Sequence, residues 1–389
     1  MQFFYTSDMP GAPALHGGAG APILNVLDAC LVTGFNLQPL ASLEVAAGIA
    51  TGTVAAGHGL VRPVRIQITS GGPLTGLHAL LSAPDANTFT FPASGIPDGS
   101  YSGASVRVAP AGWTKPFVDT DIGVYRSGDA FSTQTYYRFR VDSSETRKVY
   151  HTAFEAMTSA SVGTGQFPAF SYPDGYYFQV SPSSTSTPRK WMIVATESFF
   201  IFLAAKYESD AALNNGFTGI AIGDIPPLWG YDEFTAICTY GNLLGTHPNE
   251  DSASPLSGRP FNIRFRRRID QSTIDSSGEL SSRFSSNGIS LLMGVATDNK
   301  LVIDRLMAVE NWTTSNRNPR GWVPYLWVGF SHPTSDALYP TGQIIDGAAG
   351  SEVEGRKLYC VNAGRIIGAS TTDTSRRRAF FDVTELMPS

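Results

Sequence analysis

The segment Ser42–Leu60, SLEVAAGIATGTVAAGHGL, decides the fold class of this chain. Leu43 and Val45 alternate with polar or small residues, and glycines break the segment every few positions. Alternation with a period of two is typical of a β-strand that buries one face, and glycine favours the turns between strands. Similar runs follow at VRIQITSGG (64–72), LHALLSAPDANTFTFPA (77–93) and ASVRVAP (104–110). About five or six short strands are therefore expected between residues 42 and 108.

The larger part of the chain, after APAGWTKPF (109–117), continues with predicted strands. Alternating or short apolar runs bounded by Gly, Pro, Asp and Ser fit a sandwich or barrel better than a helical fold. The predicted strands are Tyr136–Val141, Trp191–Thr196, Ser198–Leu203, Phe217–Ile222, Pro260–Phe265, Leu291–Ala296, Leu301–Val309, Tyr325–Phe330, Lys357–Val361 and Ala379–Val383. We predict an all-β protein: a large β-sandwich or barrel-like main domain (111–389), a small inserted β module (45–110), and an N-terminal segment (1–44) that belongs to the main domain and supplies one short helix.

That helix is predicted at APILNVLDACLVTGFN (21–36). Pro22 suits the first helical position, and Gly34 suits the left-handed position just past the last turn. About three turns are marginal alone in water, so the apolar face must pack on something. That face carries Ile23, Leu27 and Leu31. Packing in the chain's own core is the simpler interpretation, and an assembly interface with a neighbouring subunit is the functional one.

The composition excludes several classes of protein. The chain has 389 residues, of which 42% are hydrophobic and only 16% charged. Its formal net charge of −5 argues against nucleic-acid binding, which needs a basic face. Cys30, Cys238 and Cys360 show no disulfide or zinc spacing, which fits folding in a reducing cytosol. No secretory signal is visible, and the longest apolar run, Phe199–Ala205, is far shorter than the roughly 20 residues of a membrane span, so no membrane insertion is expected.

No motif has the spacing of a known catalytic site. GGAGAP (17–22) lacks the Lys and Ser/Thr of a phosphate-binding loop, and HExxH, GxSxG and CxxC are absent. The acidic pairs Asp119 with Asp121 and Asp232 with Glu233 could serve glycoside cleavage, where the separation in space decides the mechanism. Acids that are adjacent in sequence are usually solvated, so this interpretation is not preferred.

The segment VYHTAFEAMT (149–158) is the only plausible second helix in the sequence. On a helix, His151 and Glu155 would share one face, a spacing that two metal ligands can use. No third ligand is evident, so a structural pair is preferred. We expect no enzymatic activity, no cofactor and no bound metal.

The basic run RFRRR (264–268) is the most prominent charge feature. In a strand, Arg264, Arg266 and Arg268 lie on one face. Guanidinium groups in a row need acidic partners, either phosphates or carboxylates. Because the chain is net acidic, we favour inter-strand or inter-subunit ion pairs over nucleic-acid contact, and a solvated face is the alternative.

Aromatic residues cluster in three segments, 171–180, 310–322 and 323–330. Such clusters occur in glycan-binding surfaces and in protein interfaces, where Tyr, Trp and Arg are enriched. The candidate glycan or partner contacts are Tyr172, Tyr176, Tyr177, Trp312 and Trp322. Core packing explains at least half of the aromatic residues more simply.

Several stretches together resemble a family of virion structural proteins of tailed bacteriophages, described as tail- or baseplate-associated. They are SDMPGAPALHGGAGAPILNVLDACLVTGF (7–35), APAGWTKPF (109–117), VYRSGDA (124–130), YYRFRVDSS (136–144), FEAMTSASVGTGQFP (154–168) and RRRAFFDVT (376–384). The module at 45–110, with GHGL (57–60) and NTFTF (87–91), is similar to small β domains that recur in phage tail proteins. The match is dense from Ser7 to Pro168 and thin from Gly175 to Asp373.

The resemblance implies a structural component of a phage tail, baseplate or neck, assembled in the host bacterial cytoplasm into the virion. Its partners would be copies of itself and other virion proteins, in a symmetric homo-oligomer. The helix would then hold the glycine-rich leader, residues 1–20, toward a neighbouring subunit. The alternative is a receptor- or glycan-binding tail module that contacts the host surface through the aromatic segments, and a polysaccharide depolymerase is a third hypothesis.

Overall fold

The computed structural model describes residues 1–169, 176–181, 183–205, 217–230, 232–233, 235–239, 261–281, 302–311, 317–330, 341–347, 353–365 and 376–388. Strands dominate these residues and helices are short, which confirms the all-β prediction. No helix in the described ranges is long and apolar enough to cross a membrane. The predicted strand Leu291–Ala296 lies outside the described residues.

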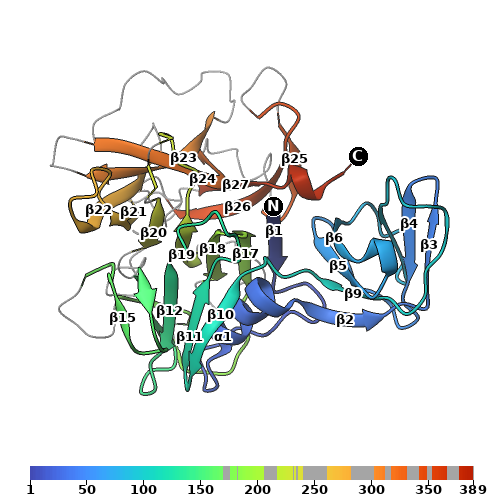
Figure 1. The fold of residues 1–389 in the computed structure, drawn as a ribbon, viewed down its shortest axis with the longest axis horizontal. Coiled ribbons are helices and arrows are strands. Elements are labelled where there is room, and N and C mark those ends of the chain that lie inside the picture. Colours follow the sequence, from blue (N-terminus) through green and yellow to red (C-terminus); the bar gives the residue numbers. More distant parts are fainter. Residues whose placement is uncertain are drawn as a thin grey trace.

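The largest element is a twelve-stranded antiparallel sheet (Figure 1). In spatial order its strands are β1 (Gln2–Thr6), β17 (Trp191–Thr196), β18 (Phe199–Ala205), β19 (Phe217–Asp224), β20 (Ala236–Thr239), β21 (Phe261–Arg267), β22 (Ile274–Ser281), β23 (Val302–Asn311), β24 (Arg317–Phe330), β27 (Arg376–Asp382), β26 (Lys357–Arg365) and β25 (Ile344–Asp346). Most strands follow one another in space as they do in sequence. The predicted strand Trp191–Thr196 matches β17 at both ends. The predicted strand Tyr325–Phe330 covers only the second part of β24, and the other predictions among the described strands of this sheet differ by a few residues.

A five-stranded sheet covers one face of the strands β17–β20. Its strands in spatial order are β10 (Thr114–Asp119), β11 (Ile122–Arg126), β12 (Tyr136–Val141), β13 (Lys148–Phe154) and β16 (Tyr176–Gln179). Phe139 contacts Phe200, with ring centroids 6.2 Å apart, and Phe178 contacts Phe202 at 5.9 Å. These side chains belong to one apolar core, so the two sheets form the sandwich part of the fold. A small hairpin of β14 (Ala156–Met157) and β15 (Gly163–Thr164) follows β13.

The other face of β17–β20 is covered by the second half of the same large sheet. Every residue of β18, FFIFLAA, is buried, which explains why its sequence is continuously apolar and not alternating. Phe4 of β1 and Tyr359 of β26 come from opposite ends of the sheet, and their ring centroids lie 4.7 Å apart. No strand ladder among the described residues joins those two ends, so the sheet curls over without closing into a barrel.

A separate lobe contains two four-stranded sheets (Figure 1). One consists of β2 (Phe35–Pro39), β9 (Ser105–Val108), β5 (Arg65–Thr69) and β6 (Gly76–Ala79), and the other of β7 (Thr88–Pro92), β4 (Ile49–Thr53), β3 (Ser42–Ala46) and β8 (Gly99–Ser100). Leu43 and Val45 are buried between exposed neighbours, as their alternation predicts. Strand β2 precedes residue 45 and pairs with β9, so the lobe in the structure begins before the expected module.

The N-terminal helix has two parts. Helix α1 (Pro22–Leu27) continues directly into a π-helical segment, η1 (Asp28–Thr33), and Gly34 ends it with φ +71°. The side chains predicted as an assembly interface are at most 1% exposed and lie in the core of the protein; they are Ile23, Leu27 and Leu31. The structure therefore gives these three residues the core role, because the chain itself covers the apolar face. Two 3₁₀ turns, η2 (Gly72–Leu74) and η3 (Thr384–Leu386), complete the helical elements of the described chain.

The glycine-rich leader packs along the chain's own strands. Strand β1 pairs with β17, the indole N–H of Trp191 donates to the Pro13 carbonyl (3.0 Å), and the Thr146 hydroxyl donates to the Gly17 carbonyl (2.5 Å). The expectation that the leader extends toward a neighbouring subunit is wrong for these residues, because their backbone groups already have partners within the chain.

The segment 149–158 is not the expected second helix but strand β13 followed by β14. Val149, His151 and Ala153 are buried at alternate positions, and the polar His151 at an inward position conceals the period of two in the sequence. The Nε2 atom of His151 lies 2.8 Å from the Thr239 carbonyl. Burial lowers the pKa of His151 to about 4, so this side chain is a neutral core residue and forms no ligand pair with Glu155.

Candidate functional site

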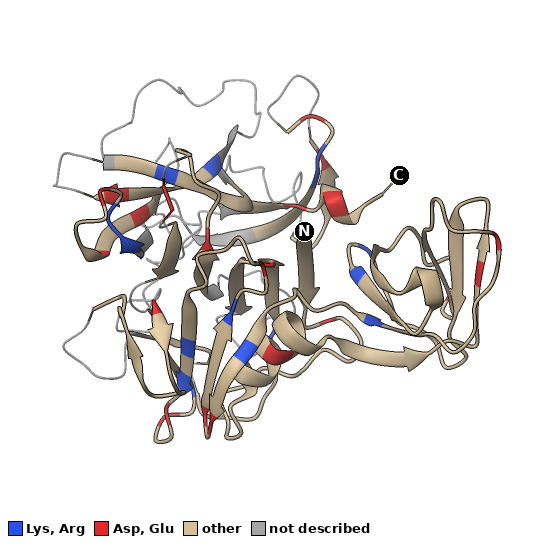
Figure 2. Cartoon of the chain, in the orientation of Figure 1, with Lys and Arg blue, Asp and Glu red and all other residues tan. Residues whose placement is uncertain are grey.

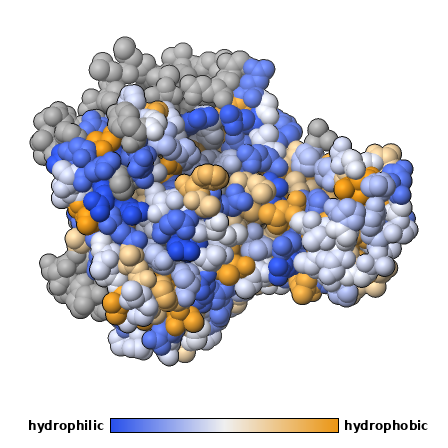
Figure 3. All heavy atoms as spheres, viewed as in Figure 1, coloured by the Kyte–Doolittle hydropathy of each residue, from blue (hydrophilic) through white to orange (hydrophobic). Residues whose placement is uncertain are grey.

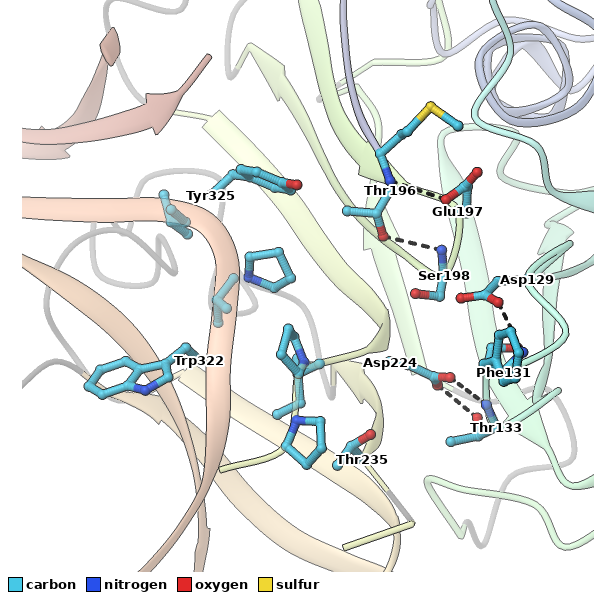
Figure 4. Close-up of a pocket in the computed structure, with 18 of the residues that line it drawn as sticks. Asp129, Phe131, Thr133, Thr196, Glu197, Ser198, Asp224, Thr235, Trp322 and Tyr325 are labelled. Carbon is cyan, nitrogen blue, oxygen red and sulfur yellow. Dashed lines mark hydrogen bonds and ion pairs between the residues drawn. The ribbon is translucent and has the colours of Figure 1, made fainter. Parts of the chain in front are cut away.

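A cleft with a volume of about 750 Å³ lies at one end of the curled sheet. Strand β24 forms one side, and the loop between β11 and β12, together with the turn between β17 and β18, forms the other. Figure 4 shows Trp322 and Tyr325 on one side and Asp129, Phe131 and Asp224 opposite them. The volume is in the range of pockets that hold small organic ligands, roughly 300–1,000 Å³.

The loop SGDAFSTQT (127–135) presents an aromatic ring at the cleft. The Phe131 amide donates to Asp129 Oδ1 (2.9 Å), and Gln134 Nε2 donates to the Asp129 carbonyl (2.6 Å). These bonds hold the loop in one conformation, yet the Phe131 side chain is 99% exposed. A large apolar side chain fully in water on an ordered loop is suited to contact a ligand or partner.

Asp224 at the end of β19 links this loop to the large sheet. Its two carboxylate oxygens accept hydrogen bonds from the Thr133 amide (2.5 Å) and the Thr133 hydroxyl (2.7 Å). Burial raises the pKa of Asp224 to about 6, although the bonds from Thr133 oppose the rise. The cleft therefore contains a carboxyl group that changes charge just below neutral pH.

The opposite side of the cleft is shaped by a bulge in β24. Met307 pairs with Trp322 and Arg305 pairs with Trp327, so β24 has the four residues Val323–Leu326 where β23 has one. Within the bulge, Tyr325 has φ +59°, a conformation that costs a residue with a side chain about 1–2 kcal/mol. The Tyr325 hydroxyl donates to Glu385 Oε1 (3.1 Å). The surrounding fold thus holds an aromatic residue in a strained backbone position beside the cleft.

Next to the cleft, a fully buried ion-pair network holds Asp232. Arg320 donates from Nε and Nη2 to the two oxygens of Asp232, at 2.6 Å each, and its Nη1 lies 3.5 Å from Glu310 Oε1. The side chains of all three residues have no exposed surface. Asp232 is therefore engaged by Arg320 and does not form a solvated pair with the exposed Glu233.

The other acidic pair considered from the sequence, Asp119 and Asp121, lies at the hairpin between β10 and β11, and neither residue lines the cleft.

The basic run supports the cleft loop from behind. Arg266 donates from Nη1 to the Thr133 carbonyl (2.6 Å) and from Nε to Glu155 Oε1 (3.1 Å). Arg267 donates to both oxygens of the same Glu155, at 2.6 and 2.8 Å. One carboxylate thus serves two guanidinium groups, and this cluster ties β21 to the elements around β13.

The other two arginines of the predicted row have carboxylate partners of their own. Arg264 lies 3.6 Å from Asp275 on the neighbouring strand β22, and Arg268 lies 3.8 Å from Asp270. One expected inter-strand ion pair, Arg264 with Asp275, is therefore present within the chain, whereas Arg268 and Asp270 both lie in the connection between β21 and β22. Figure 2 shows charged residues of both signs scattered over the described elements in this view. Ion pairs with a neighbouring subunit stay a prediction.

Among the five candidate aromatic contacts, Trp322 lines the cleft. Tyr172 and Trp312 lie outside the described residues, and only the backbone of Tyr176 is described, in β16. Tyr177 is on the five-stranded sheet, where it contacts the Tyr150 ring (centroids 5.7 Å apart). Contact of Trp322 or Tyr177 with a glycan or partner stays a prediction.

Phe131, Tyr325 and Asp224 were not singled out from the sequence. The available signal for Phe131 was an isolated aromatic residue in a loop of Ser, Gly, Asp and Thr. No comparable signal marks Asp224, because its burial depends on a loop that is far away in the chain.

The sequence matches no protein-family model. No curated protein matches it either. Among solved structures, a comparison pairs the chain with Phage phi92 endosialidase at 9% sequence identity and a TM-score of 0.17, over 90% of this chain. The chain spans about half of that protein, 52% of its length. A TM-score this low establishes neither a shared fold nor a shared function.

The chemistry of the cleft follows from its lining. In the part of the chain that the structure describes, no three His, Cys, Asp or Glu residues are grouped so that they could hold a metal ion. The lining instead combines aromatic rings with carboxylates, which accept hydrogen bonds when ionised. The arrangement can bind a molecule that has both apolar faces and hydroxyl or amine donors.

Proposed function

We propose that this protein is a component of a phage tail that binds a host-surface glycan in the cleft. The observation that carries the proposal is the placement of aromatic side chains on both sides of one cavity, with the carboxylates of Asp129 and Asp224 on the side of Phe131. Phe131 comes from one side, and Trp322 and Tyr325 come from the other.

A sugar ring has two kinds of surface that match this lining. Its C–H faces are apolar and pack on aromatic rings, which supply a large contact area. Its hydroxyl groups are hydrogen-bond donors, and the carboxylates of Asp129, Asp224 and Glu233 are acceptors. Ligand pockets typically combine such apolar walls with a few placed polar groups.

Both walls are ordered before any ligand arrives. The Phe131 loop is fixed by its own hydrogen bonds and by the contact of Thr133 with Asp224. The β24 bulge is anchored through Tyr325 and Glu385. A site that is already in place loses little conformational entropy on binding, so a modest contact area can give useful affinity.

The location in a phage tail is supported by the sequence stretches that resemble virion structural proteins. We propose that the protein assembles there with copies of itself and with other virion proteins, and that it binds the glycan without cleaving it. On the face in Figure 3, apolar residues form small groups separated by hydrophilic ones. Such a surface gives subunit contacts a largely polar character.

Glycan binding is tested with Phe131→Ala, because a side chain that is fully exposed can be removed without harm to the fold. Immobilised bacterial lipopolysaccharides and capsular polysaccharides serve as probes, and binding is measured by surface plasmon resonance. We expect the dissociation constant of the best probe to rise about tenfold, the loss typical of one anchoring aromatic contact. Leu37→Ala is the matched control, because Leu37 is also exposed (63%) but lies in the other lobe.

If the Phe131→Ala variant and the wild-type protein bind the probe with equal affinity, the proposal that the glycan binds in this cleft is wrong. Mass spectrometry of purified particles separately tests the location, and absence of the chain from them would contradict it. Release of reducing ends from a bound polysaccharide would show that the protein cleaves what it binds.

A further inference from the structure

We infer that the cleft selects neutral or positively charged glycans and excludes polyanionic ones. The inference rests on the proposed function, and it names the chemical class of the ligand. Six carboxyl groups lie around the cleft, against two arginines and the amino group of Met1; they belong to Asp129, Glu197, Asp224, Asp232, Glu233 and Asp382. The charge of Asp232 is matched by the buried Arg320, so the other five set the charge of the cleft.

The cationic groups of the cleft already have partners. The Met1 amino group pairs with Glu197 (3.1 Å), and Arg356 pairs with Asp382. The guanidinium of Arg305 lies over the Trp327 ring, 4.8 Å from its centroid. An incoming carboxylate would have to displace the ion pair of Met1 or Arg356, or pair with Arg305, whose in-plane N–H groups the ring contact does not use.

Asp129 and Glu233 form no ion pair with a described residue, and Asp224 is influenced by the charge of Arg266 without a salt bridge to it. Asp129 accepts a hydrogen bond from the Phe131 amide, Asp224 accepts two from Thr133 of the same loop, and Glu233 is exposed. All three residues line the cleft, so their ionised carboxylates can accept hydrogen bonds from a bound molecule. Acceptors of this kind suit sugar hydroxyls or an ammonium group, and they repel sialic acid or uronic acid units.

The aromatic residues distinguish the cleft from a merely acidic surface, because they can bind the apolar face of a sugar beside the carboxylates. Phe131 lines one side of the cavity and Trp322 and Tyr325 line the other, so a sugar bound there lies close to the carboxylates of Asp129 and Asp224. A polymer with one negative charge per repeat would bring that charge into the same space.

The test compares polysaccharides of different charge on the full chain. Dextran and mannan are the neutral probes, chitosan oligomers the cationic probe, and polysialic acid and hyaluronan the anionic probes, in 50 mM salt at pH 7.5. We expect the tightest binding from a neutral or cationic probe, with the anionic probes at least about tenfold weaker.

Charge removal sharpens the comparison. The ratio between the dissociation constants of the anionic probes and of the best neutral probe is the affinity gap. In the double variant Asp129→Asn and Glu233→Gln, this gap should narrow by about tenfold, because two repulsive charges are gone. Asparagine retains the oxygen that accepts the Phe131 amide, and Glu233 is exposed, so the fold should persist. Glu44→Gln removes one exposed charge in the other lobe and should leave the gap unchanged.

The outcomes separate this inference from the proposed function. If an anionic polymer binds most tightly and Phe131→Ala weakens that binding, the glycan-binding function stands and the charge preference is wrong. If the double variant leaves the gap as wide as in the wild-type protein, the carboxylates do not cause it and the inference also fails. If no probe of any charge binds, the proposed function and the inference fail together.

Discussion

Two ionic clusters flank the cleft, and they differ in their access to water. Arg320 is completely buried with Asp232 and Glu310. Arg266 and Arg267 share Glu155, and the side chains of these three residues are between 16% and 30% exposed. The first cluster supports the β24 side, and the second supports the loop that carries Phe131.

The contrast shows which ion pairs the fold depends on. A charge without water must be matched by an opposite charge and by hydrogen bonds, so loss of one partner leaves an uncompensated charge in the interior. A partly hydrated pair can recover most of its lost energy from solvent. The buried network is therefore expected to control stability, and the hydrated cluster to control the position of the loop.

The largest effect is expected for Arg320→Met. The substitution leaves Asp232 and Glu310 buried without their cation, and the free energy of unfolding should fall by about 3–5 kcal/mol at pH 7. Urea denaturation followed by tryptophan fluorescence measures it. The same change in the other cluster, Arg266→Met, is the matched control and should cost about 1 kcal/mol, since Glu155 keeps Arg267. Equal losses in the two variants would contradict the comparison.

The next effect concerns Asp224, whose pKa is set mainly by burial and only to a smaller extent by a neighbouring cation. Burial raises its pKa to about 6, Asp129 adds to the rise, and Thr133 and Arg266 oppose it. Because the folded state then binds the proton more tightly than the unfolded chain, this group should add about 2–3 kcal/mol of stability as the pH falls from 7 to 4.

The stability difference between the wild-type protein and Asp224→Asn, measured in urea across this pH range, isolates that contribution from the other acidic groups. As the pH falls, the free energy of unfolding of the wild-type protein should rise relative to that of the variant. A difference that stays constant with pH would show that Asp224 has an ordinary pKa.

A smaller effect with the opposite pH dependence is expected for Glu155→Gln. Burial by itself raises the pKa of Glu155, but the hydrogen bonds from Arg267 and Arg266 outweigh it and hold the pKa below its usual value. The stabilisation is therefore present at neutral pH and is lost as the pH falls through the folded-state pKa. We expect the variant to lose about 1 kcal/mol at pH 7 and progressively less in acid, by the same urea measurement. A loss that grows in acid would be inconsistent with the pairing.

The smallest effect is expected for an ion pair at the surface. Asp346 pairs with Lys357, and its side chain is 77% exposed. Water and salt replace such a pair at almost no cost, so Asp346→Asn should leave the urea midpoint within error of the wild-type value. A measurable loss would mean that hydration does not explain the difference between the clusters.

The strands were predictable where one face is buried and the other is not. Leu43 and Val45 alternate with exposed residues, and Tyr136–Val141 matches β12 at both ends. The prediction failed where burial did not follow residue type. His151 occupies a core position in β13, where the sequence predicts a helix, and β1, with four of its five residues buried, lies in the segment predicted as a leader.

The cleft was only partly predictable for a different reason. Trp322 stands in an aromatic segment and was found, but its counterpart Phe131 comes from a polar loop far away in the chain. The raised pKa of Asp224 depends on burial by Thr133 and its neighbours, which no local pattern encodes. Sites built from distant segments become visible only when the sheets are assembled.

The pairing of β1 with β17 has a consequence for the order in which the protein forms during translation. Phe4 finds its partner strand at Val194, so the first strand leaves the ribosome long before the strand that it must join. The lobe between Phe35 and Val108 has all its strand pairs within a short span and can fold as soon as it emerges. The nascent chain therefore carries a folded small lobe while the apolar segment QFFYT is still unpaired, because its partner β17 has not yet been synthesised. Exposed apolar segments of this kind are prone to aggregation, so chaperones are expected to matter most during this interval.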